Sequence, residues 1–174
     1  MLFSILLFCH FARRSPDSPR FGFTLEVRRV STLSVQPFTT TLRVRHYEMD
    51  ALGHVNNAVY QHYLEHAAIE HSEHLGFGVE HYRELGGLFV MRRIQIDYLR
   101  PASAGDVLEV TTWLEQMRGT RATRRYEIRK QGEVEMLVTA EALWVWVDAT
   151  AMRPRGIPDE ILSTFGELRS RSTD

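Results

Sequence analysis

Residues 46–57, HYEMDALGHVNN, separate a stretch with the pattern of a β-strand from a stretch with the pattern of an α-helix. Upstream, residues 38–47 alternate apolar and polar side chains, which is the period of a strand with one buried face. Downstream, residues 57–75 repeat apolar side chains every three or four positions, as a helix does when it buries one side. The segment 46–57 is therefore predicted to be the loop between a first strand and a long helix.

The apolar side chains of the predicted helix form a single stripe along its length. Its members are Tyr60, Tyr63, Leu64, Ala67, Ala68, His71 and Leu75. Gly76 follows directly, and glycine commonly ends a helix because it adopts the left-handed backbone conformation at little cost. The stripe predicts a helix that lies against a sheet and ends at Gly76.

The rest of the chain reads mainly as strands that follow one another with short turns. A short turn or helix is expected at 79–85, and strands are expected at 88–99, 106–117, about 121–130 and about 133–148. Strands joined by short turns pair antiparallel. The sequence therefore predicts an α+β domain, in which one long helix covers one face of an antiparallel sheet.

The loop itself concentrates polar groups at the expected amino end of the helix. Gly53 permits a tight turn, and Asn56 or Asn57 can cap the helix. A helix amino terminus presents unpaired backbone N–H groups and the positive end of the helix dipole, which favour an oxygen that gains negative charge. Asp50 lies on the same loop. A carboxylate beside an oxyanion site is what acyl transfer to water requires.

These residues also resemble a known family. The pattern D-x-x-G-H-V-N-N-x-x-Y-x-x-Y-x-E over residues 50–65 resembles the active-site signature of hotdog-fold thioesterases of the 4-hydroxybenzoyl-CoA thioesterase type. The stretches 91–106, MRRIQIDYLRPASAGD, and 153–161, RPRGIPDEI, resemble later parts of the same family. The likeness extends over about residues 38–165. It implies a sheet of about five strands wrapped around one long central helix.

The resemblance implies an activity and an assembly. The expected activity is hydrolysis of acyl-CoA or acyl carrier protein thioesters to the free acid and the thiol, without a metal or redox cofactor. Family members form homodimers that often pair into homotetramers, with the active site at the subunit interface.

Three residues are expected to be catalytic. The resemblance makes Asp50 the nucleophile or general base, and it gives the backbone N–H of Asn57 the task of polarising the thioester carbonyl. Glu65 matches a helical carboxylate, which is the catalytic one in another branch of the fold. Asp50 ranks first because it belongs to the loop motif; the alternatives are that Asp50 only holds the turn through its side chain and that Glu65 is structural.

Other residues of the motif are expected to contact substrate. These substrate-binding positions are His54, Val55, Asn56 and Tyr60. Several arginines could bind the phosphates of the leaving group. The alternative is that each faces solvent and pairs with an acidic residue. These arginines are Arg92, Arg93, Arg100, Arg118, Arg121, Arg124 and Arg125.

Two rival functions stay open. A hotdog hydratase or dehydratase would use a histidine and a carboxylate, here His54 and Glu65, and a non-catalytic protein would bind acyl groups without turnover.

Potential metal ligands recur along the predicted helix at His62, His66, Glu70, Glu73 and His74. A metal site is nevertheless disfavoured, because the sequence lacks the motif H-E-x-x-H. Serine-based hydrolysis is disfavoured because no G-x-S-x-G occurs.

The length and composition of the chain indicate the number of domains. The chain has 174 residues, a formal net charge of −1 and one cysteine, so it suits one domain and shows no bias toward nucleic acid. Residues 38–165 are expected to form that domain and 166–174 a polar tail. Residues 1–37 read as a disordered leader or a mis-assigned start, with an apolar run too short to span a membrane. The expected location is cytoplasmic, with organelle targeting through this Arg- and Ser-rich segment as the alternative.

Overall fold

The computed structural model describes residues 37–167. The helices and strands follow in the order β1 (Phe38–Arg43), η1 (His46–Glu48), α1 (Asn57–His74), α2 (Val79–Glu84), β2 (Gly87–Tyr98), β3 (Val107–Arg118), β4 (Arg121–Lys130), β5 (Met136–Asp148) and α3 (Asp159–Glu167). The five strands form one sheet with the order β1-β3-β4-β5-β2, and every neighbouring pair is antiparallel. The predicted α+β class and antiparallel five-stranded sheet are confirmed.

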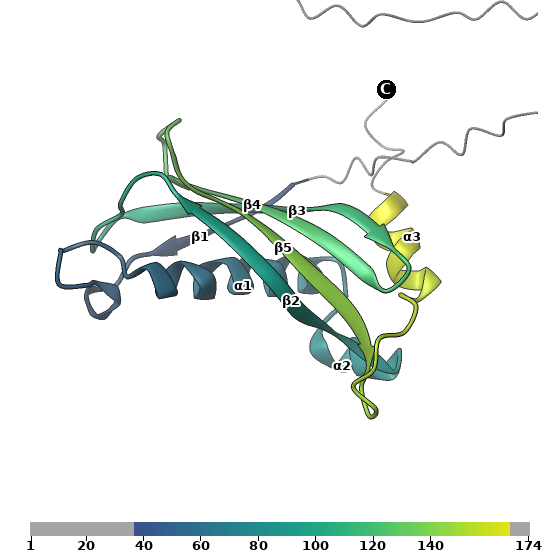
Figure 1. Cartoon of the computed structure of the whole chain (residues 1–174). Coiled ribbons are helices and arrows are strands. Elements are labelled where there is room, and N and C mark those ends of the chain that lie inside the picture. The colour runs from purple at the N-terminus through teal and green to yellow at the C-terminus, as the bar shows by residue number, and fades with distance from the viewer. Residues whose placement is uncertain (1–36, 168–174) are drawn as a thin grey trace, which may run out of the picture. The chain divides into compact units, whose positions relative to one another are not determined.

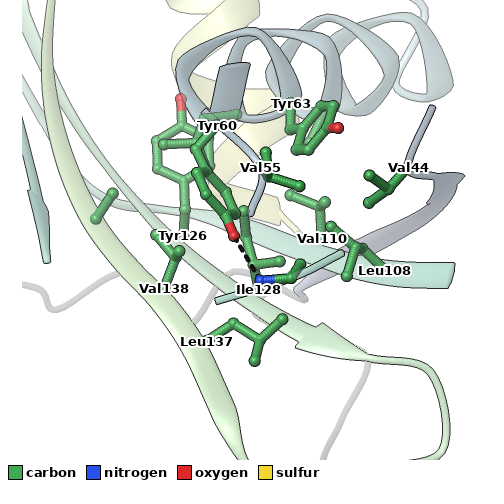
Figure 2. Close-up of a cluster of buried hydrophobic side chains, with 14 of the residues drawn as sticks. Val44, Val55, Tyr60, Tyr63, Leu108, Val110, Tyr126, Ile128, Leu137 and Val138 are labelled. Atoms are coloured by element: carbon green, nitrogen blue, oxygen red, sulfur yellow. Dashed lines mark hydrogen bonds between the residues drawn. The ribbon is translucent and has the colours of Figure 1, made fainter. Parts of the chain in front are cut away.

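Helix α1 lies along one face of the sheet, which curves over it (Figure 1). Its buried side chains are those of the predicted stripe with Ser72 in place of the half-buried Leu75. Leu64 and Ala67 are 0% exposed, and they pack with inward-facing residues of the sheet such as Val110 and Ile128. Figure 2 shows Tyr60 and Tyr63 projecting from the helix into the same cluster. Each large apolar side chain buried in this way contributes roughly 1.5–3 kcal/mol to stability.

Two strand boundaries differ from the prediction by more than one residue. The first strand ends at Arg43 instead of residue 47, because residues 46–48 turn into the short helix η1. The last strand begins at Met136 instead of about residue 133, and Val134, placed in it by the alternation, is 89% exposed. Gly76 ends α1 as predicted, with a φ of 86°.

The carboxyl-terminal helix α3 was not predicted. Its residues Ile161 and Phe165 are 0% and 1% exposed and join a second apolar cluster with Phe77, Tyr82 and Trp146. The predicted leader 1–37 and tail 166–174 lie almost wholly outside the described residues, so both remain predictions. Within residues 37–167, no helix is long and apolar enough to cross a membrane.

Candidate active site

Asp50 organises the loop that leads into α1. Its Oδ1 accepts hydrogen bonds from the backbone N–H groups of Leu52 at 2.8 Å and His54 at 3.2 Å. Its own N–H donates to the His54 carbonyl at 2.7 Å, and Gly53 completes the turn with a φ of 78°. Its other oxygen, Oδ2, has no hydrogen-bond donor in the part of the chain that the structure describes. Asp50 therefore holds the turn with one oxygen and leaves the other available for chemistry.

Val55 and Tyr60 attach this loop to the core. Both are 2% exposed, and the Val55 N–H donates to the Ala102 carbonyl at 2.9 Å. The Ala102 N–H in turn donates to the Tyr60 hydroxyl at 3.2 Å. Burial raises the pKa of Tyr60, which keeps the hydroxyl neutral. The structure thus places two of the four expected substrate-binding side chains inside the protein, while His54 and Asn56 are exposed on the loop.

A buried carboxylate that the sequence analysis missed fixes the other side of the loop. Glu48 is 7% exposed, and its Oε2 accepts from the Tyr63 hydroxyl at 2.7 Å and from the Arg45 N–H at 2.6 Å. Burial and then the Glu48 carboxylate raise the pKa of Tyr63. The Glu48 carbonyl also accepts from the Asn56 N–H at 2.9 Å. The sequence contained one indication of this carboxylate: Tyr63 belongs to the apolar stripe, and a buried tyrosine hydroxyl needs a hydrogen-bond partner.

The amino end of α1 offers an unoccupied donor. The Asn56 Oδ1 accepts from the Ala58 N–H at 2.9 Å, so Asn56 is the capping residue of the two that the sequence allowed. Asn57 is then the first helical residue, and within residues 37–167 its N–H has no acceptor. The Asn57 carbonyl accepts from the Tyr98 hydroxyl at 2.9 Å. This free N–H and the free oxygen of Asp50 occur at the same end of the helix.

Glu65 lies elsewhere on α1. Eight residues separate it from Asn57, which corresponds to about 12 Å along the helix axis. Its side chain is exposed and lines a pocket of about 300 Å³ between α1, α2 and β2. Within one chain the structure therefore does not bring Glu65 together with Asp50, whereas Asp50, Asn56 and Asn57 share one loop and helix end.

The pocket beside Glu65 is apolar apart from a few side chains. Residues from several elements line it, including Ile69, Phe89, Trp144 and Arg124. Its volume lies at the lower end of the range typical of small-molecule sites, about 300–1,000 Å³. The pocket lies along α1 and not at the Asp50 loop.

Arg124 is buried at this pocket, contrary to the solvent-facing alternative given for it. It is 5% exposed, whereas Arg93, Arg100 and Arg125 form ion pairs on the surface. Arg124 was grouped with solvent-facing or phosphate-binding arginines, and the solvent-facing assignment is wrong for it. Alternation in β4 gave the signal, because Arg124 falls between Ala122 and Tyr126 on the inward face.

His71 accepts a hydrogen bond from Arg124, with 2.9 Å between Nη1 of Arg124 and Nδ1 of His71. The His71 ring also stacks on Phe38 with centroids 5.3 Å apart and meets the edge of Phe165 at 5.7 Å. Burial, followed by the positive charge of Arg124 and a smaller contribution from His74, lowers the pKa of His71 to about 3. His71 is therefore held neutral.

The histidines on the outer face of α1 do not form a metal centre in the described residues. His66 contacts Glu70 at 3.2 Å, and no group of three His, Cys, Asp or Glu side chains comes together between residues 37 and 167. The five potential ligands that the sequence placed along this helix are thus not assembled as a set in the single chain.

Residues 44–165 match the sequence model of the family described as the thioesterase-like superfamily. The chain belongs to the thioesterase-like superfamily. This membership confirms the family expected from residues 50–65. Together with the similarity to a solved probable thioesterase YbaW from Escherichia coli, it also confirms the hotdog fold: the TM-score is 0.65 at 26% identity, covering 76% of this chain and 98% of YbaW.

Two curated relatives carry more specific names. The chain is 34% identical over 128 residues to the acyl-CoA thioester hydrolase YbgC of Escherichia coli, covering 74% of this chain and 95% of YbgC. It is also 34% identical over 127 residues to the chloroplastic acyl-acyl carrier protein thioesterase ATL3 of Arabidopsis thaliana, covering 71% of this chain. The chain spans 65% of the length of ATL3.

The neutral His71 predicts a pH dependence of stability. As the pH falls below the ordinary value of 6.5, the unfolded chain takes up a proton that the folded chain accepts only near pH 3. His71 therefore imposes no loss above pH 6.5, and the free energy of unfolding decreases as the pH falls from 6.5 toward 3. We expect a decrease of about 2 kcal/mol by pH 5 from this residue.

Urea unfolding of the wild type and His71→Gln between pH 5 and pH 8 measures this effect. The variant keeps an acceptor for Arg124 but cannot take up the proton. Its free energy of unfolding should therefore decrease by about 2 kcal/mol less than that of the wild type between pH 8 and pH 5, which gives a smaller slope against pH. His62→Gln, which removes an exposed histidine of the same helix, should keep the wild-type slope. Equal slopes for the wild type and His71→Gln would show that His71 is not the titrating group.

Proposed function

We propose that this chain hydrolyses acyl thioesters of coenzyme A or acyl carrier protein at the amino end of α1. The main observation in support is that, among the residues the structure describes, one carboxylate oxygen of Asp50 and the N–H of Asn57 both lack a hydrogen-bond partner at this helix end. The printed names of YbgC and ATL3 support thioester hydrolysis, and they include both kinds of thiol carrier.

The proposed reaction uses Asp50 as general base and Asn57 as the donor to the oxyanion. Water attacks the thioester carbonyl carbon while Asp50 Oδ2 accepts its proton. The carbonyl oxygen becomes an oxyanion that the Asn57 N–H and the helix dipole stabilise. When the C–S bond breaks, the thiolate takes the proton back from Asp50 and leaves as the thiol. Direct attack by Asp50 on the carbonyl is the alternative use of the same oxygen.

The other expected site residues take roles that fit their positions. His54 and Asn56 flank the reacting carbonyl from the exposed loop, and Asn56 also keeps the helix end in place. Val55 and Tyr60 position the loop from the core instead of contacting the acyl group through their side chains. Glu65 contributes to the wall of the acyl pocket.

We also propose that the site is completed in a homodimer, which can pair further into a homotetramer. Strand β2 is a sheet edge twelve residues long, and an unpaired edge of this length favours pairing with another strand. Val90, Tyr98 and Leu99 are exposed along it or just beyond its end, at 40%, 44% and 54%. Two copies related by a two-fold axis across this edge would place their α1 helices antiparallel. Each Asp50 loop could then approach the middle of the partner helix.

The cellular location is a further prediction. The cytoplasm is the expected place, and organelle targeting is the alternative because ATL3 is named as chloroplastic.

The two rival functions predict other assay results. Hydration of crotonyl-CoA would favour the hydratase function, and acyl-CoA binding without release of thiol would favour the non-catalytic one.

The two carboxylates predict different kinetics. Asp50→Asn removes the base and should lower kcat about 10²–10⁴-fold with little change in KM. The Asn side chain still presents an oxygen to the N–H groups of Leu52 and His54, so the loop should keep its conformation. Glu65→Gln should cost less than about tenfold. Thiol release from acyl-CoA in the presence of EDTA measures both.

Equal unfolding midpoints for the wild type and both variants are the control for folding. Near-normal turnover by Asp50→Asn together with an inactive Glu65→Gln would place the catalytic carboxylate on the helix. Loss of wild-type activity in EDTA that zinc restores would point to the histidine face of α1.

The proposed dimer predicts the mass in solution. Light scattering at micromolar protein should give at least twice the chain mass of 20.2 kDa. Val90→Lys places a charge at the β2 edge and should shift the protein toward the monomer, because edge lysines oppose strand pairing. Thr41→Lys, an exposed position on the opposite edge strand β1, should leave the mass unchanged. A monomeric wild type would contradict the proposal.

A further inference from the structure

The pocket along α1 contains a buried positive charge without a countercharge. Arg124 is 5% exposed and lines the pocket, yet within residues 37–167 it forms no ion pair with a carboxylate. Its Nη1 donates to Nδ1 of His71 at 2.9 Å and to the Thr112 hydroxyl at 3.2 Å. Both acceptors are neutral. The guanidinium therefore remains charged and uncompensated, since arginine does not lose its proton in proteins.

Other neighbours of Arg124 do not supply the missing charge. Tyr82 and Tyr126 lie close enough to interact with it, but burial raises the pKa of both hydroxyls and keeps them neutral. Glu65 and Glu73 line the same pocket from exposed positions, and neither forms an ion pair with Arg124. A buried charge of this kind is costly unless an opposite charge or several acceptors reach it.

Arg124 also keeps donors free for a ligand. Both hydrogen bonds to described residues use Nη1, so Nε and Nη2 have no acceptor there. A guanidinium presents its N–H groups in a planar fork that matches the two oxygens of a carboxylate. The surrounding walls, including Phe77, Leu114 and Trp144, are apolar. The pocket thus combines a mainly apolar lining with one buried cation, while its two carboxylates, Glu65 and Glu73, are exposed.

We propose that this pocket binds the acyl part of a thioester whose far end is a carboxylate, and that Arg124 pairs with that carboxylate. The inference rests on the proposed hydrolysis and names its substrate class: half-thioesters of dicarboxylic acids. The position of Arg124 fits a distal group if the partner's Asp50 loop approaches the middle of α1 near Glu65, as in the proposed dimer, on which the inference also rests. His71, which accepts a hydrogen bond from Arg124, is six residues beyond Glu65, or about 9 Å further along the axis of α1. The methylene groups of the substrate's acyl chain lie against the apolar lining between the thioester and the distal carboxylate.

Matched substrates of equal chain length test the inference. Suberyl-CoA and octanoyl-CoA differ only in the terminal group, and adipoyl-CoA and hexanoyl-CoA form a shorter pair. We expect kcat/KM to favour the carboxylated member of at least one pair about tenfold or more. Arg124→Met keeps an unbranched apolar stem and should reverse that preference. Arg83→Met, which removes an exposed arginine of α2, should leave it unchanged.

A binding measurement on the wild type makes the test independent of turnover and of how the variant folds. Monomethyl suberate and methyl octanoate, in which a methyl ester replaces the thioester, are titrated while tryptophan fluorescence is followed, since Trp144 lines the pocket. Tighter binding of monomethyl suberate, weakened by salt, supports the role of Arg124. If no acyl-CoA releases thiol but monomethyl suberate binds in this way, the proposed hydrolysis fails and the carboxylate pocket stands.

Two results would overturn the inference while hydrolysis stands. One is preferential hydrolysis of octanoyl-CoA and hexanoyl-CoA by the wild type, with methyl octanoate binding more tightly than monomethyl suberate. The other is an unchanged substrate preference in Arg124→Met. A loss of the dimer in that variant would then show that a carboxylate of a second copy compensates Arg124.

Discussion

The packing of α1 against one face of the sheet is the constraint on which the remaining structure depends. The helix has one apolar stripe, and the sheet has one face able to cover it, so a rotation of the helix would expose the stripe and bury charged side chains. Small residues at Ala67 and Ala68 let the backbone approach the strands closely. Once this face is buried, the position of each end of the helix is fixed.

The same packing positions the proposed reactive groups. Tyr60 and Tyr63 belong to the buried stripe (Figure 2), and their hydroxyls bond to Ala102 and Glu48 on either side of the loop. The loop is thus attached to the core through the residues that seat the helix. A donor held rigidly in this way needs no rearrangement when charge develops on the substrate, which is the condition for strong oxyanion stabilisation.

The sequence predicted features that arise from local pattern, and it missed those that depend on distant contacts. The stripe of α1 and the turn at Gly53 follow from spacing and backbone chemistry within a few residues. For Glu48 the buried Tyr63 indicated only that some hydrogen-bond partner was needed, because the two residues meet only after the helix packs. The depth of Arg124 depends on sheet curvature and on the cover from α1, and α3 is stabilised by the cluster that contains Trp146.

The most direct measurement of the central claim is the turnover of Asn57→Pro, which removes the backbone N–H assigned to the oxyanion. Proline is well tolerated at the first position of a helix, and Asn56 has the extended conformation, with ψ of 134°, that a following proline requires. Asn57→Ala keeps the N–H and serves as the control. The account predicts that Asn57→Pro lowers kcat about 10²–10³-fold at unchanged stability, while Asn57→Ala stays within about tenfold. Equal turnover of the two folded variants would contradict it.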